Sequence, residues 1–98
     1  PDYWLPYFLL GKQYLTTEPL VAAMWFAQGW PVAQQEIAYL NNYAILLSKL
    51  NCHLQATDLI AAALQIAPDN SYLLDSQQQI LAAPQVDAKA TSECLVTP

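Results

Sequence analysis

The positions of proline constrain this chain more than any other feature. Five interior prolines separate stretches that contain only two glycines, and these prolines are Pro6, Pro19, Pro31, Pro68 and Pro84. Proline lacks a backbone N–H and is tolerated in the first turn of a helix but not in its interior. Because Ala, Leu and Gln dominate and β-branched residues never alternate, the sequence predicts a series of short helices joined by tight turns.

Start and stop signals predict five helices, over residues 5–16, 17–29, 31–50, 56–67 and 71–83. We expect Thr17 to cap the second helix and Gly29 to close it in the left-handed conformation. Asn51 is the expected stop of the third helix. The turn formed by residues 68–71 carries polar side chains that suit the cap of the fifth.

The fourth of these helices has the clearest pattern. One apolar stripe follows the helical period, through Ala56, Leu59, Ile60, Ala63, Leu64 and Ala67. The short connections predict an all-α fold of antiparallel helix hairpins within residues 1–84. Residues 85–98 have no apolar period, so we expect a flexible tail.

Charge excludes one class of partner. The chain of 98 residues has 3 lysines and no arginine against 8 acidic residues, which gives a net charge of −5. A nucleic-acid surface needs a basic stripe, so we expect no nucleic-acid partner. No apolar run is long enough to span a membrane. Only 11% of the residues are charged, so we expect another protein to cover part of the surface.

A repeat is visible along the chain, with a period of about 34 residues. Residues 40–47 and 56–60 followed by Pro68 read L-x2-YA-x2-L…A-x3-I…P, and an earlier copy in residues 7–14 reads Y-x2-LG-x2-Y. The first helix of a third copy places Leu74 and Leu81 in register. This pattern resembles that of the tetratricopeptide-repeat family, W-x2-L-G-x2-Y…A-x3-F…P. Small residues at Ala44 and Ala56 let the two helices of a hairpin approach closely.

The resemblance implies a stacked array of hairpins with a C-terminal cap helix and a groove that binds a helical or extended apolar segment of another protein. The groove residues that it implies are Phe8, Lys12, Leu15, Asn41, Asn42, Ile45, Ser48, Lys49, Asp75 and Gln79. With no arginine and two lysines among these positions, an apolar segment suits the groove better than a terminal carboxylate.

Residues for catalysis are not evident. The sequence has no phosphate-binding glycine loop, no metal-ligand spacing and one histidine, His53, so we expect no enzyme activity, no cofactor and no metal. The second helix is apolar on nearly every face. Either the neighbouring helices cover it or Trp25 or Trp30 meets another chain, and the N-terminal aromatics raise the same possibility of an oligomer.

Cys52 and Cys94 lie far apart in the sequence. We favour free thiols in a reducing, cytoplasmic compartment, with a disulfide to the tail as the alternative. The function that we expect is a non-catalytic module that shelters a segment of a partner. Small acidic chaperones of bacterial type III secretion are similar in size, acidity and expected fold. The alternative is a structural subunit or repeat segment of a larger assembly.

Overall fold

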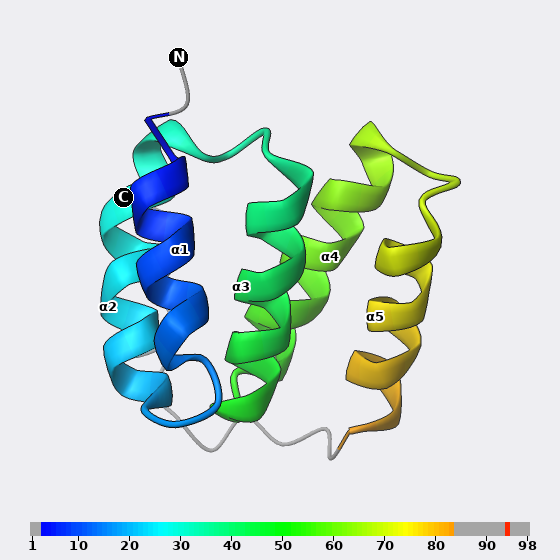
Figure 1. Cartoon of the computed structure of the whole chain (residues 1–98). Coiled ribbons are helices and arrows are strands. Elements are labelled where there is room, and N and C mark those ends of the chain that lie inside the picture. The colour runs from blue at the N-terminus through cyan, green and yellow to red at the C-terminus, as the bar shows by residue number, and fades with distance from the viewer. Residues whose placement is uncertain (1–2, 84–93, 95–98) are drawn as a thin grey trace.

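The computed structural model describes residues 3–83 and 94, and every regular element within them is helical. The elements are α1 (Leu5–Tyr14), α2 (Pro19–Gly29), the 3-10 helix η1 (Trp30–Val32), α3 (Ile37–Lys49), α4 (His53–Ile66) and α5 (Ser71–Ala82). Successive α-helices run in opposite directions (Figure 1). The predicted all-α class is confirmed for this part of the chain.

Helix α3 occupies the centre of the arrangement. It packs against α2 on one side and against α4 and α5 on the other, while α1 packs mainly against α2. In Figure 1 the α1–α2 pair lies at one end of the molecule and α5 at the other. The two ends are therefore connected through the side chains of α3.

Two predicted helix boundaries are confirmed. Asn51 has a φ of 64°, the left-handed conformation that ends α3. Asn70 caps α5, because its Oδ1 accepts a hydrogen bond of 3.1 Å from the backbone N–H of Leu73. Both effects depend only on residues that are close in the sequence, so a sequence pattern can predict them.

Two other boundary predictions are wrong, and a third is right in position but wrong in backbone conformation. Glu18, not Thr17, precedes α2, and within the described residues no side chain caps that end. Helix α2 ends at Gly29 as predicted, but Gly29 keeps a right-handed φ of −83° and the chain continues directly into η1. Pro31 belongs to η1, and α3 begins only at Ile37. A turn at residues 33–36 therefore replaces the predicted first turns of the third helix.

The glycines serve close helix packing instead. A Cβ atom added to Gly29 would lie 2.5 Å from Cβ of Tyr7, and one added to Gly11 would lie 2.6 Å from the ring of Phe26. Neither distance is compatible with ordinary contact. Because Tyr7 Cβ is fixed by the α1 backbone, Gly29 has no room for any side chain at this crossing of α1 and α2.

Phe26 is the centre of an aromatic cluster that joins α1, α2 and α3. Its ring stacks on Tyr43 at a centroid distance of 5.1 Å and meets Tyr39 edge-on at 5.0 Å. Phe8 approaches Phe26 at 6.5 Å, and the Tyr39 hydroxyl donates a 2.6 Å hydrogen bond to the backbone carbonyl of Phe26. Edge-on and offset pairs of this kind stabilise a core beyond the area that they bury.

The α3–α4 pair is built from aliphatic side chains. Ala44 and Ala56 are completely buried, as their predicted place at a close helix crossing requires. Leu40 and Ile60 are completely buried as well, and Leu47 nearly so. Small residues bring the helices together and branched ones fill the space around them.

Helix α5 differs from the prediction by one residue of register. Its buried residues are Leu73, Ser76 and Ile80, whereas Leu74 and Leu81 are 43% and 51% exposed. The interval from Leu40 to Leu73 equals the interval from Tyr7 to Leu40, so the period is more regular than the sequence pattern indicated.

The two cysteines form a disulfide, which corrects the prediction of free thiols. Cys52 and Cys94 are bonded across 42 residues of sequence, with Cα atoms 5.6 Å apart. Both side chains are buried. The spacing of the two cysteines in the sequence does not predict this bond, because only the folded helices bring Cys52 and Cys94 together. The predicted flexible tail, residues 85–98, otherwise lies outside the described residues.

Candidate functional site

Two adjoining hollows follow the contact between α3 and α5, which we call the α3–α5 seam. The first has a volume of about 290 Å³ and is lined by Ile37, Ala38, Asn41, Asn42, Asn70, Tyr72 and Leu73. The second, of about 110 Å³, is lined by Ile45, Ser48, Lys49, Gln79 and Ile80. Six of the ten predicted groove residues therefore lie on this seam, namely Asn41, Asn42, Ile45, Ser48, Lys49 and Gln79.

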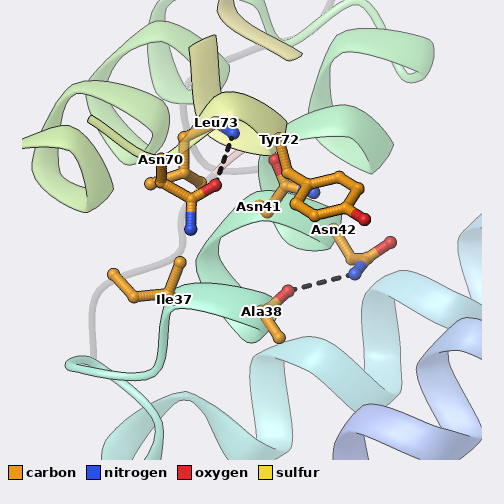
Figure 2. A pocket seen from close by; sticks show the side chains of 7 residues that line it. All are labelled: Ile37, Ala38, Asn41, Asn42, Asn70, Tyr72 and Leu73. Atoms are coloured by element: carbon orange, nitrogen blue, oxygen red, sulfur yellow. Dashed lines mark hydrogen bonds between the residues drawn. The ribbon is translucent and has the colours of Figure 1, made fainter. Parts of the chain in front are cut away.

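The first hollow combines apolar walls with carboxamide groups. Figure 2 shows the side chains of α3 on one side and Asn70, Tyr72 and Leu73 on the other. Ile37, Ala38 and Leu73 provide the apolar surface. Tyr72 is 79% exposed, so its ring stands at the rim with most of its surface free for contact. Such an exposed aromatic residue beside a hollow is typical of protein interfaces.

The carboxamides of the first hollow differ in their hydrogen bonds. Nδ2 of Asn42 donates to the backbone carbonyl of Ala38 at 3.0 Å, and Oδ1 of Asn70 accepts from Leu73. Oδ1 of Asn41 is buried and has no hydrogen-bond partner among the described residues. A buried acceptor without a donor costs about 1–3 kcal/mol.

The second hollow is smaller and has a positive charge at its edge. Ile45 and Ile80 supply its apolar surface, and the charge belongs to the exposed Lys49. Ile45 is partly exposed, unlike its buried neighbours Ala44 and Leu46. The predicted role of Ile45 in binding a partner stays a prediction.

The remaining predicted groove residues do not join the seam. Phe8 is buried in the aromatic cluster, so its prediction as a binding residue is wrong: α1 packs this ring against Phe26 and Tyr39. Lys12 extends over the outer side of Phe8, with Nζ 5.7 Å from the ring centroid. Leu15 follows the end of α1 and packs half-buried against the core.

Asp75 lies on the exposed side of α5 and lines neither hollow. It accepts a 3.1 Å hydrogen bond from Nε2 of Gln79, one turn further along. Sequence reasoning missed Tyr72 and Ile80, because it predicted α5 one residue out of register. The signal that locates them is a constant repeat interval, measured from Tyr7 through Leu40.

Of the two tryptophans considered for an interface, Trp30 is buried against Tyr43 at 6.0 Å, so that alternative is wrong for Trp30. Trp25 is partly exposed. The surface of α2 instead exposes Leu20 and Met24, at 66% and 56%. A second apolar surface therefore exists at the α1–α2 end, and neither hollow of the seam reaches it.

Cys52 precedes His53 in the sequence but has no free thiol that could act as a nucleophile, because it is in the disulfide. His53 is the first residue of α4 and is partly buried. Within residues 3–83 and 94, no group of three or more His, Cys, Asp or Glu side chains is placed to hold a metal ion.

Burial raises the pKa of the Tyr43 phenol to about 12, and burial also raises the pKa of Tyr39. Both phenols are therefore neutral at physiological pH and act as packing groups in the aromatic cluster. No helix in the described part of the chain is long and apolar enough to cross a membrane.

Comparisons of this chain with protein-family models, with curated proteins and with solved structures found no match. The geometry of the seam is therefore the main guide to function.

Proposed function

We propose that this chain is a non-catalytic protein-interaction module that binds and shelters an apolar or amphipathic segment of a partner protein along the α3–α5 seam. The observation that carries this proposal is the pair of hollows that brings six predicted groove residues together. The first hollow, at about 290 Å³, lies at the lower end of small-molecule pockets, which span about 300–1,000 Å³. It suits one side chain of a partner better than a whole metabolite.

A tetratricopeptide-like architecture is part of the same proposal. The equal intervals from Tyr7 to Leu40 and from Leu40 to Leu73 support it, as does the alternating order of packed helices. Buried Gly11 and Ala44 occupy equivalent positions of successive units. In such an array α5 serves as the cap helix.

The disulfide bears on where the module works. Disulfides persist in oxidising compartments and are rare in the cytosol. The bond between Cys52 and Cys94 therefore favours an oxidising compartment over the cytoplasm expected from free thiols. It also weakens the comparison with secretion chaperones, which hold their subunits before export.

A structural subunit of a larger assembly is the second candidate function. Exposed Leu9 on α1, together with Leu20 and Met24 on α2, favours it, because these side chains are 55%, 66% and 56% exposed. In that case the neighbouring subunit covers the α1–α2 end and the seam is secondary.

Selection of binders from a random peptide library displayed on phage, with the whole chain immobilised, tests the proposal. The affinity of the best peptide is measured by fluorescence anisotropy for the wild type and for Ile45→Asp. We expect a loss of at least about tenfold, or about 1.4 kcal/mol, because the variant places a charge in the second hollow.

Leu20→Asp is the matched control, since it makes the same kind of change on the far surface. Circular dichroism verifies that each variant folds, and Lys49→Glu replaces Ile45→Asp if the latter unfolds. Loss of binding in Leu20→Asp alone favours the structural-subunit candidate. Unchanged binding in the seam variants contradicts the proposed site.

A further inference from the structure

We draw no further inference here: the strongest candidate, the apolar face that α2 exposes with Leu20 and Met24 at the α1–α2 end of the molecule, carries nothing because nothing in the described part of the chain shows what covers it.

Discussion

At the α1–α2 end, the helices approach closely at Gly11 and Gly29. Aromatic residues fill the space that a side chain at either position would need. The α3–α4 pair meets through alanines surrounded by leucine and isoleucine. Gly29 leaves less than a methyl group of space beside Tyr7, whereas Ala56 is buried in a helix pair of aliphatic side chains. A small residue at a helix crossing therefore does not by itself show how tightly the two helices pack. The side chains that occupy the space beside it decide this.

The two regions also differ in how they are fastened. The aromatic cluster joins α1 and α2 to α3 without a covalent link, and its central ring is Phe26. The α3–α4 pair instead has the disulfide at Cys52, in the turn where α3 passes into α4. We expect the two regions to respond to different perturbations, and the following experiments are ordered from the largest effect to the smallest.

Reduction of the disulfide should have the largest effect. A bond across 42 residues restricts the unfolded chain, and the chain-entropy relation gives about 4 kcal/mol for a loop of this length. We expect a clear fall in the melting temperature with a phosphine reductant, measured by circular dichroism. Deletion of residues 85–98, which removes Cys94, should have the same effect. The double variant Cys52→Ser/Cys94→Ser is the control, since its melting temperature should not respond to the reductant.

Gly29→Ala should be the most costly single substitution at the aromatic end. The new methyl group overlaps Cβ of Tyr7, so α1 and α2 must separate, and we expect a loss of about 3 kcal/mol, the upper end of the range for overpacking. Urea unfolding measures the change in the free energy of unfolding. Gln28→Ala is the exposed neighbour and should be nearly neutral. A stabilising Gly29→Ala, as helix propensity alone predicts, would show that the crossing is looser than described.

Ala56→Leu tests the aliphatic crossing in the same way. Because flexible aliphatic neighbours rearrange more readily than a fixed Cβ, we expect a loss of about 2 kcal/mol, below that of Gly29→Ala. Ala62→Leu makes the same change on an exposed face of α4 and should be nearly neutral. Equal losses in Ala56→Leu and Gly29→Ala would remove the distinction between the two crossings.

Alkaline titration should produce the smallest effect at moderate pH and should act on the aromatic end. The folded pKa of Tyr43 is raised to about 12 from its ordinary value of 10.0, so the folded chain holds this proton more tightly than the unfolded chain. The stability that this tightly held proton contributes to the folded chain is fully present below pH 10 and is lost as the pH rises toward 12. Linkage gives a loss of about 1.4 kcal/mol at pH 11 relative to pH 8.

Tyr43→Phe removes this ionisation and should reduce the decline in the free energy of unfolding between pH 8 and pH 11, whereas the part due to Tyr39, whose pKa is also raised by burial, remains. Stopped-flow unfolding and refolding at each pH give the free energy of unfolding from the ratio of the two rate constants, before disulfide exchange sets in. A slope that Tyr43→Phe does not alter would mean that the decline has another origin.

Local signals in the sequence were reliable where one residue decides the backbone. Asn51 and Asn70 end and begin helices as predicted, because a left-handed φ and a side-chain cap depend on immediate neighbours. The predicted groove residues on α3 line the hollows for a related reason. Positions three and four apart on one helix share a face whatever the rest of the chain does.

The predictions failed where distant segments decide the outcome. Phe8 occupies a groove position by register, yet it is buried because α2 and α3 supply Phe26 and Tyr39 beside it. Gly29 has the residue type of a helix terminator, but it is required by the approach of Tyr7. In both cases the deciding atoms come from another helix.

Residue type and spacing along one helix were enough to predict the all-helical class, the helix ends at Gly29 and Asn51 and the shared face of the α3 residues that line the seam. The register of α5, the pairing of Cys52 with Cys94 and the unsatisfied oxygen of Asn41 became visible only in the folded chain. Each of these depends on which atoms of separate segments come within contact distance. That distance is set by the packing of all the helices together.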